Sequence, residues 1–180
     1  EAGSYLSKFS ELIRSILYNS REEYISLEKE ISTLKNYLEI QQLRYNKMFD
    51  YEIDVDSEID IEMIAVPPML AQPFIENSVE HGIKDLPGKG FISIKFSLSD
   101  ESIFMIIEDN GIGVEASKKL KDGKAKEHKS LATIITKERI TILNSKLKRK
   151  SFSIQITDIV GRDGKVEGTR IKFIIPFLEL

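Results

Sequence analysis

The feature that most constrains the fold is a pair of neighbouring stretches, residues 91–98 and 103–109, that have the composition of two β-strands. In the first, apolar and polar residues alternate, which is the pattern of a strand with one buried face. The second is a nearly continuous apolar run. Only a short polar segment around Ser99-Asp100 separates them, so they are predicted to pair as an antiparallel hairpin.

The end of this hairpin carries a candidate site. The second stretch runs into Asp109-Asn110-Gly111-Ile112-Gly113, so a strand delivers a carboxylate directly to a glycine-containing segment. Glycine has no Cβ and lets the backbone come close to a phosphate or a base. Asn-Gly is also a common turn dipeptide, but a turn alone leaves Gly113 unexplained. The stretch therefore favours a nucleotide site in which Asp109 accepts a hydrogen bond.

A second candidate group lies in a helix predicted over residues 67–83. Pro67-Pro68 suit its first turn, whereas Pro73 predicts either a kink or a later start. Asn77 sits among apolar residues, where it is either a satisfied core amide or a ligand. Its amide oxygen is a hard donor that suits magnesium accompanied by phosphate. His81 follows four residues later, on the same face of a regular helix.

The first fifty residues are predicted to be helical. Apolar residues between 5 and 17 recur at three- and four-residue steps, and Ser26 has the character of an N-cap for a second helix. The second helix carries a seam at heptad-like spacing, formed by Leu27, Ile31, Leu34, Leu38, Gln41 and Tyr45. Two interpretations remain open: the seam packs on the following domain, or it belongs to a helical bundle shared with a second subunit.

The remaining pattern mixes strands and helices. A short strand is predicted at 51–55, a polar loop at 115–129 and a helix at 131–147. Alternating residues predict two further strands around 152–156 and 171–175, joined by a glycine-bearing turn. Hairpins interleaved with helices indicate an α+β fold, a two-layer sandwich preceded by a helical segment.

Composition excludes several classes of function. The chain has 180 residues, a formal net charge of −3 and no cysteine. Nonspecific nucleic-acid binding is disfavoured because it requires a basic face, and disulfides and thiolate metal sites are impossible. There is no apolar run of about 18 residues and no P-loop motif. Because the chain opens inside a helical pattern, we expect it to be a fragment of a longer protein.

These motifs resemble those of a known superfamily. Asn77 within Pro-Phe-Ile-Glu-Asn-Ser-Val-Glu-His-Gly, followed by Asp109-Asn110-Gly111-Ile112-Gly113, resembles the N box and first glycine box of the GHKL ATPases. Residues 6–14, 27–31, 37–45 and 67–73 are similar to the LytS/YehU-type sensor histidine kinases within that group. The resemblance covers nearly the whole chain and implies a Bergerat-type ATP-binding fold.

The resemblance implies roles for individual residues. Asp109 matches the aspartate that accepts from the adenine amino group, and Asn77 matches the asparagine that coordinates magnesium beneath the phosphates. Gly111 and Gly113 match the loop beside the nucleotide, and Thr169 matches a threonine that supports the adenine pocket.

Further assignments concern the edges of the site. Ser130 and Leu131 fall in the second glycine box, residues 115–129 correspond to the ATP lid, and His81 is a candidate ATP contact. Glu76 is a candidate to orient or deprotonate the imidazole that receives the phosphate.

The sequence departs from the family pattern in three ways. Ala132 replaces a glycine of the second glycine box, and Ser130 stands where another is common. Glu80 stands where many relatives have a lysine. The phosphoacceptor histidine is absent from these residues, and its usual place is upstream of Glu1. The resemblance therefore implies an ATP-binding half that does not phosphorylate itself.

The expected activity is that of a protein-histidine kinase, with phosphate passing from Mg-ATP to the upstream histidine and then to a response-regulator aspartate. Residues 1–48 would belong to the dimerisation and phosphoacceptor region, and 49–180 would form the catalytic domain. We expect a homodimeric parent, anchored in the bacterial inner membrane, with this portion in the cytoplasm. A nucleotide-binding dimerisation module without catalysis is one alternative. A chaperone- or topoisomerase-type GHKL ATPase is another, although Pro73 occupies the position of its catalytic glutamate.

Overall fold

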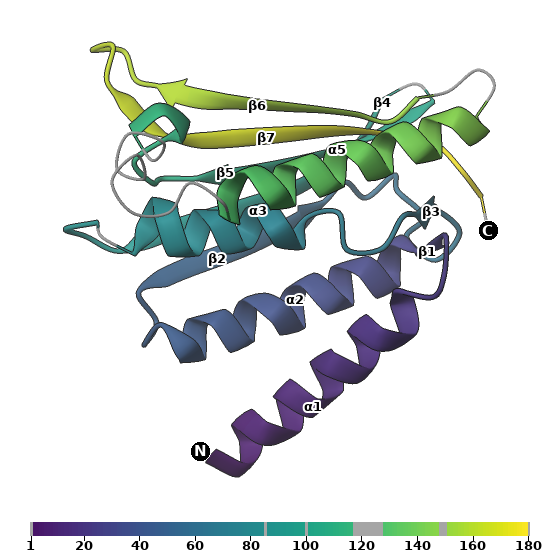
Figure 1. Ribbon diagram of the computed structural model, residues 1–180, viewed down its shortest axis with the longest axis horizontal. Helices are drawn as coiled ribbons and strands as arrows, with labels where there is room; N and C mark the ends of the chain where they lie inside the picture. The colour runs from purple at the N-terminus through teal and green to yellow at the C-terminus, as the bar shows by residue number, and fades with distance from the viewer. Residues whose placement is uncertain (1, 85, 100, 117–127, 148–150, 180) are drawn as a thin grey trace.

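The computed structural model describes residues 2–84, 86–99, 101–116, 128–147 and 151–179 (Figure 1). The helical elements are α1 (Ala2–Asn19), α2 (Leu27–Arg44), α3 (Gln72–Asn77), the π-helical segment η1 (Ser78–Ile83) and α5 (His128–Lys146). The strands are β1 (Ile25–Ser26), β2 (Phe49–Val55), β3 (Ala65–Val66), β4 (Gly90–Ser99), β5 (Ser102–Asp109), β6 (Ser153–Val160) and β7 (Val166–Pro176). Among the described helices, none combines the length and the apolar character needed to cross a membrane.

A five-stranded sheet in the order β2-β4-β5-β7-β6 forms one layer of the molecule. The predicted hairpins are confirmed: β4 pairs antiparallel with β5, and β6 pairs antiparallel with β7. Strand β2 lies parallel to β4, which the residue pattern did not predict. A parallel pair needs a long crossover connection, and here residues 56–89, including α3 and η1, supply it.

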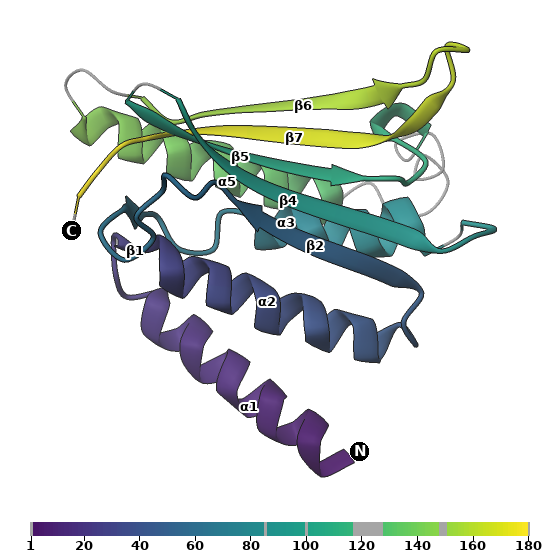
Figure 2. The same cartoon turned by 180° about the vertical axis from the view of Figure 1, so that it is seen from behind.

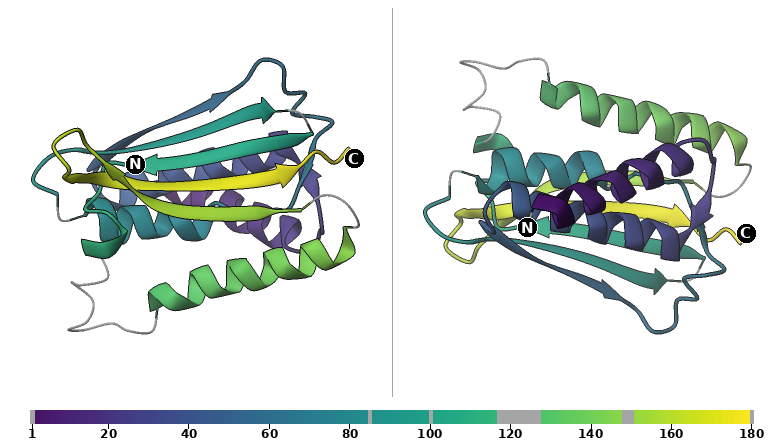
Figure 3. Two further views of the ribbon diagram at one scale, coloured as in Figure 1. Left: turned by 90° about the horizontal axis from the view of Figure 1, so that it is seen from above. Right: turned by 90° about the horizontal axis from the view of Figure 1, so that it is seen from below.

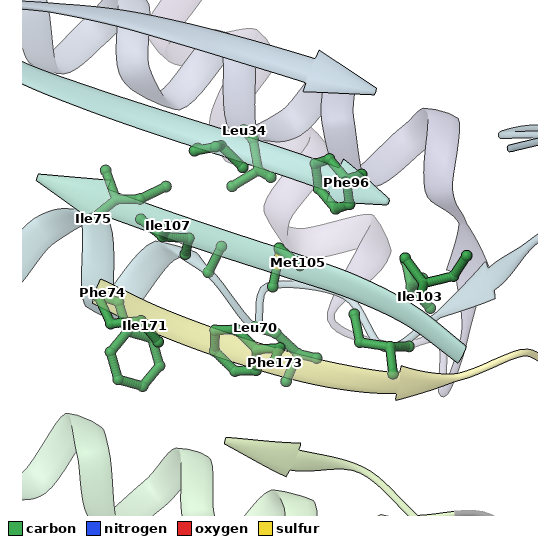
Figure 4. Packing of buried hydrophobic residues seen from close by; sticks show 14 of the residues in the cluster. Leu34, Leu70, Phe74, Ile75, Phe96, Ile103, Met105, Ile107, Ile171 and Phe173 are labelled. Carbon is green, nitrogen blue, oxygen red and sulfur yellow. The ribbon is translucent and has the colours of Figure 1, made fainter. Parts of the chain in front are cut away.

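The helices form the second layer, on one face of the sheet (Figures 1, 2 and 3). Alternate residues of the central strands point to this side and are buried, as period-two patterning requires. These are Ile92, Ile94 and Phe96 of β4, Ile103, Met105 and Ile107 of β5, and Ile171, Phe173 and Ile175 of β7. Phe74 and Ile75 of α3 and Leu34 of α2 meet them in the core (Figure 4). The predicted two-layer α+β fold is confirmed.

Helix α2 packs on the sheet layer. Its N-cap is Ser26, as predicted, and the Ser26 hydroxyl accepts from the backbone N–H of Lys29 at 3.3 Å. Leu27, Leu34 and Leu38 of the heptad-like seam are completely buried in the core of the domain. The interpretation that the seam packs on the following domain is therefore confirmed, and the alternative of a seam kept for a second subunit is wrong for these leucines.

Helix α1 lies on α2, on the side away from the sheet, and diverges from it toward the N-terminus (Figure 2). Asn19 and Thr33 join the two helices near their connection, with the Asn19 amide donating to the Thr33 hydroxyl at 3.2 Å. An exposed apolar stripe runs along α1; we define this α1 stripe as Leu6, Phe9, Ile13 and Leu17.

The helix predicted over residues 67–83 has the later start that Pro73 allowed, and its end at Ile83 is confirmed. It begins at Gln72, so Pro73 lies in the first turn, where a missing N–H costs nothing. After Asn77 the helix widens into η1, in which the N–H of Lys84 donates to the carbonyl of Val79 at 3.1 Å. Such π-helical turns are rare and occur frequently at functional sites.

A buried carboxylate fastens α2 to the segment before α3. Glu30 is 3% exposed, and its two oxygens accept from the backbone N–H of Met69 at 3.1 and 3.0 Å. Met69 has a left-handed φ of 61°, and the neighbouring Pro68 carbonyl accepts from Arg139 Nη1 of α5 at 2.6 Å. We call Glu30, Pro68, Met69 and Arg139 the Glu30 joint, because they connect α2, the loop before α3 and α5.

Candidate functional site

The site is organised around Asp109, the last residue of β5. Its side chain is only 4% exposed, and both carboxylate oxygens are held by donors from different segments. The Ser78 hydroxyl donates to Oδ2 at 2.5 Å, and the backbone N–H of Gly111 donates to Oδ1 at 2.9 Å. A buried carboxylate requires such partners, because desolvation is costly for a charge. The structure therefore presents Asp109 as an oriented acceptor.

Glycines let η1 approach the segment that follows β5. A Cβ added to Gly111 would lie 2.6 Å from the Cα of Gly82 and 2.8 Å from Asp109 Oδ1. The N–H of Ile112 donates to the carbonyl of Gly82 at 3.2 Å, so the two segments are joined by a backbone hydrogen bond. A side chain at Gly111 would force them apart, which explains the first glycine of the motif.

The second glycine of the motif has a different reason. Gly113 has a φ of +84°, in the left-handed region, and an added Cβ would lie 2.3 Å from Val166 Cγ1. The next residue, Val114, donates its N–H to Asp158 Oδ1 of β6 at 2.5 Å. Asp158 was missed by the sequence analysis, since only the sheet order brings β6 to this segment.

Thr169 lies beside Asp109 because β5 and β7 pair in the register Asp109↔Thr169. Side chains directly opposite in an antiparallel pair lie on the same face, so both point to the helix layer. The preceding residue, Gly168, brings the strands close: an added Cβ would lie 1.8 Å from the carbonyl oxygen of Asp109. Two residues predicted from distant parts of the sequence are thus neighbours.

Asn77 and His81 are both half-buried and lie on the element that carries Ser78. Asn77 is the last residue of α3, directly before Ser78, and His81 lies within η1 and has interaction partners of its own. The prediction that they share one face assumed a regular α-helix. The helix instead widens into a π-helical segment at Ser78, and the shared face of Asn77 and His81 stays a prediction.

Glu76 and Glu80 relate to α2 rather than to Asp109. The Glu80 carboxylate accepts from the Tyr45 hydroxyl at 3.2 Å and lies 3.6 Å from Arg44 Nη2. Glu76 is exposed. Burial, and then the charge of Glu76, raise the pKa of Tyr37 above its ordinary value. The charge of Glu80 is thus offset by Arg44 of α2.

Known proteins resemble this chain in sequence and in fold. A family model described as histidine kinase matches residues 1–49. The sensor protein LytS of Oceanobacillus iheyensis is 29% identical over 98% of this chain, which spans 29% of that protein. LytS of Staphylococcus saprophyticus is 28% identical over 100% of this chain and 29% of its own length. The chain thus spans less than a third of the length of these relatives.

Over nearly its whole length, this chain is similar in sequence to the LytS sensor proteins.

Solved structures extend the comparison to the fold. The Acinetobacter baumannii histidine kinase AdeS aligns with a TM-score of 0.57 and 14% identity, over 96% of this chain and 78% of its own. The mycobacterial sensor histidine kinase MprB gives a TM-score of 0.56 with 14% identity, over 88% of this chain and 100% of its own. The fold of this chain is therefore similar to that of these histidine kinase structures.

The remaining predicted site residues lie at or beyond the start of α5, next to the residues that the structure does not describe. Helix α5 begins at His128, three residues before the predicted start at Leu131. Ser130 and Leu131 therefore belong to its first turn, but their side chains lie outside the described residues, as do residues 117–127 of the expected lid. Whether the second glycine box cradles phosphate is thus a prediction that the structure does not test.

The donor set is compatible with a magnesium ion that arrives with nucleotide phosphates. Within the described ranges, no cluster of three or more histidine, cysteine, aspartate or glutamate residues could hold a metal ion. The amide oxygen of half-buried Asn77 can supply one hard ligand. Magnesium usually keeps water and phosphate oxygens for its other positions, so a single protein ligand is sufficient in principle.

Proposed function

We propose that the chain is the ATP-binding catalytic part of a bacterial sensor histidine kinase. The observation that carries the proposal is the buried, doubly held Asp109 carboxylate at the mouth of β5, beside glycines that let η1 lie against the following segment. An acceptor fixed in this way is suited to the exocyclic amine of adenine, because geometry and charge are both set before the ligand arrives.

The other residues are assigned around this anchor. Thr169 supports the base beside Asp109, and Gly111 and Gly113 shape the backbone along the nucleotide. Asn77 coordinates magnesium together with the phosphates. His81, Ser130 and Leu131 complete the ATP contacts, with residues 115–129 as the lid. The adjacency of Asp109 and Thr169 in the sheet, and of Asn77 and Ser78 in the chain, supports this arrangement.

The reaction assigned to the parent protein is phosphoryl transfer. A nitrogen of the receiving imidazole attacks the γ-phosphorus of ATP, the bond to the bridging oxygen breaks, and ADP leaves. Catalysis of this kind relies on positioning and on stabilising phosphate charge, and magnesium contributes the latter. We assign to Glu76, which is exposed, the role of orienting the imidazole or accepting its proton. The phosphate then passes to a response-regulator aspartate.

We also propose separate roles for the two regions of the chain. Residues 1–48 belong to the dimerisation and phosphoacceptor region, whose receiving histidine lies upstream of Glu1, and residues 49–180 bind ATP. The exposed α1 stripe supports a homodimeric parent, because an apolar row of this length on a helix is typical of an interface. The LytS relatives motivate an inner-membrane parent with this portion in the cytoplasm.

Calorimetric titration with Mg-ATP and Mg-ADP tests the proposal. Asp109→Asn replaces a charged acceptor by an amide that presents both a donor and an acceptor. Losing a hydrogen bond to a buried charge is expected to cost about 1.5–3 kcal/mol, roughly ten- to a hundredfold in affinity. Asn77→Ala is expected to weaken the magnesium-dependent part of ATP binding more than ADP binding without magnesium. Equal affinities of wild type and Asp109→Asn would overturn the assignment.

A labelling experiment separates catalysis from simple binding. With labelled ATP, this chain is expected to acquire no acid-labile phosphohistidine, whereas a version extended upstream acquires it. Labelling at His81 or His128 would contradict the placement of the phosphoacceptor. An extended protein that binds ATP without labelling would favour the non-catalytic module, for which Ala132 and Ser130 in the second glycine box are the motive.

A further inference from the structure

Ser78 lies within the N-box stretch, directly after Asn77, but none of the assignments above gives it a role. It is the first residue of η1 and is 4% exposed. Its hydroxyl lies 2.5 Å from Asp109 Oδ2, a short hydrogen bond between residues 31 positions apart in the sequence. Gly82 of the same element also lies near Asp109, because an added Cβ would be 3.3 Å from Oδ1.

The direction of this hydroxyl is unusual for a helical residue. Helical serine and threonine hydroxyls commonly return to a carbonyl of the preceding turn. Thr33 does so with the carbonyl of Lys29, Thr141 with that of Lys137 and Ser145 with that of Ile142. Ser78 instead reaches across to the sheet. The Ser78 hydroxyl therefore contacts β5 instead of donating to a carbonyl of its own helix.

The chemical effect falls on the acceptor of the site. A carboxylate only accepts hydrogen bonds, whereas a carboxylic acid must donate one. Asp109 receives a donor on each oxygen, the Ser78 hydroxyl on Oδ2 and the Gly111 N–H on Oδ1. Two donors on opposite oxygens prevent rotation of the group and match its ionised form. They also come from two different segments, so the orientation of the carboxylate depends on η1 as well as on its own loop.

We infer that Ser78 is a positioning residue that determines base specificity, by holding Asp109 as an ionised acceptor. An acceptor matches the exocyclic amine of adenine and repels the carbonyl oxygen that hypoxanthine carries at the same position. This inference rests on the proposed function, since it concerns the same nucleotide site. Because Asn77 directly precedes Ser78, the groups assigned to the phosphate end and the base end are also consecutive in the chain.

Replacement of the hydroxyl tests the inference in the intact chain. Mg-ADP and Mg-IDP, which differ at the base, are titrated into wild type and Ser78→Ala. The variant is expected to lose about tenfold in ADP affinity and little in IDP affinity, so the ratio of the two falls about tenfold. Ser78→Thr keeps a hydroxyl and is expected to restore much of the ratio. A purely structural role would weaken both ligands alike.

Ser93→Ala is the matched control, because the Ser93 hydroxyl also donates to a carboxylate, Glu52 Oε1 at 2.9 Å, but at an exposed position. Its ADP-to-IDP ratio is expected to equal that of wild type. If Ser78→Ala does not fold, Ser78→Cys, with a weaker donor of similar size, is expected to lower the ratio in the same direction. A wild-type ratio in whichever of these variants folds overturns the inference.

The Asp109→Asn variant shows whether a negative result concerns only the role of Ser78 or the whole nucleotide site. If Asp109→Asn lowers ADP affinity while Ser78→Ala leaves the ratio unchanged, only the role of Ser78 is wrong. If Asp109→Asn also leaves ADP affinity unchanged, the proposed nucleotide site itself is wrong.

Discussion

Helices α1 and α2 have equal lengths of 18 residues and both carry apolar residues at helical spacing, but they bury these residues differently. Leu34 and Leu38 of α2 are completely buried in the domain core, whereas Leu17 of α1 is 60% exposed. Helix α2 lies between α1 and the sheet (Figure 1). Periodicity therefore predicts that a face is suited to burial, but the order of the layers decides which face is covered within the chain.

The largest expected effect tests this difference through stability. Leu34→Ala in α2 is expected to lower the free energy of unfolding by about 2–5 kcal/mol, because it leaves a cavity in the core. Leu17→Ala in α1 makes the same chemical change at an exposed position and is expected to have an effect within about 0.5 kcal/mol. Urea unfolding of both variants measures the contrast. Similar losses would show that the α1 stripe is as well covered as the core.

The same reasoning changes the expectation for charged substitutions in the α2 seam. Leu34→Asp and Leu38→Asp place a carboxylate in a completely buried position, which is costly without a partner. These variants are expected to unfold the domain rather than only dissociate a dimer, as loss of near-UV circular dichroism would show. If the variants instead remained folded as monomers, the result would support packing of the seam against a second subunit.

The Glu30 joint supplies the next effect, which appears as a pH dependence. Burial raises the pKa of Glu30 from 4.5 to about 7, although the Met69 N–H and Arg139 oppose the shift. Between these values the unfolded chain loses the proton and the folded chain keeps it. The contribution of this group to stability is thus fully present below pH 4.5 and is lost as the pH rises through 7, by about 3 kcal/mol in total.

Glu30→Gln removes this titration while keeping a side chain of the same length that can accept from Met69. The difference in unfolding free energy between wild type and Glu30→Gln is expected to shift against wild type as the pH rises from about 4.5 to about 7.5. Chemical unfolding at several pH values measures it. A difference independent of pH would mean that Glu30 titrates alike in the folded and unfolded chains. Helix α1 has no carboxylate among the buried residues of the described ranges. We therefore expect the packing of α1 to add no comparable pH dependence to the unfolding free energy.

The α1 stripe is expected to act on association rather than on folding. Ile13→Asp with Leu17→Asp should weaken dimerisation at least about tenfold, since each buried aliphatic side chain contributes about 1.5–3 kcal/mol. Unfolding of the monomer should change little. Sedimentation of the two forms decides it, with Ile142→Asp on α5 as a control because Ile142 is also exposed. A wild type that stays monomeric at every concentration would leave the stripe without this role.

The smallest effect is expected at the ion pair between Lys8 of α1 and Glu39 of α2. Both side chains are partly exposed, so water and salt screen the attraction, and such pairs contribute about 0.2–1 kcal/mol. Lys8→Met should therefore lower the unfolding free energy by less than about 1 kcal/mol, and added salt should remove most of the difference. A larger loss would indicate that α1 is attached to α2 more firmly than its exposure suggests.

Local patterns predicted the hairpins and the anchor of the site well, for a physical reason. The β4–β5 and β6–β7 pairs join segments close in sequence, so alternation and turn residues contain the necessary information. Asp109 was recognisable because a carboxylate directly after a strand and before glycines has few structural explanations.

Features that depend on distant segments could not be read in this way. The parallel pairing of β2 with β4 and the contact of Asp158 with Val114 follow from the sheet order, and the bond from Ser78 to Asp109 follows from the packing of η1 on the sheet. The widening of the helix after Asn77 has no signal in a residue pattern that fits a regular helix equally well. Local propensity does not distinguish a regular helix from one with a π-helical segment when tertiary packing decides between them.

The parallel β2–β4 pair has a consequence for the order in which the molecule folds. Hairpins close within a few residues, whereas β2 reaches its partner only after residues 56–89 have crossed over the sheet. Non-local pairings of this kind form slowly, because loop-closure entropy is lost before contacts compensate it. We therefore expect pulsed hydrogen exchange during refolding to protect β4–β5 and β6–β7 first and β2 last. The segment that carries Asn77 and Ser78 lies in that crossover, so nucleotide binding should be recovered only in the late phase.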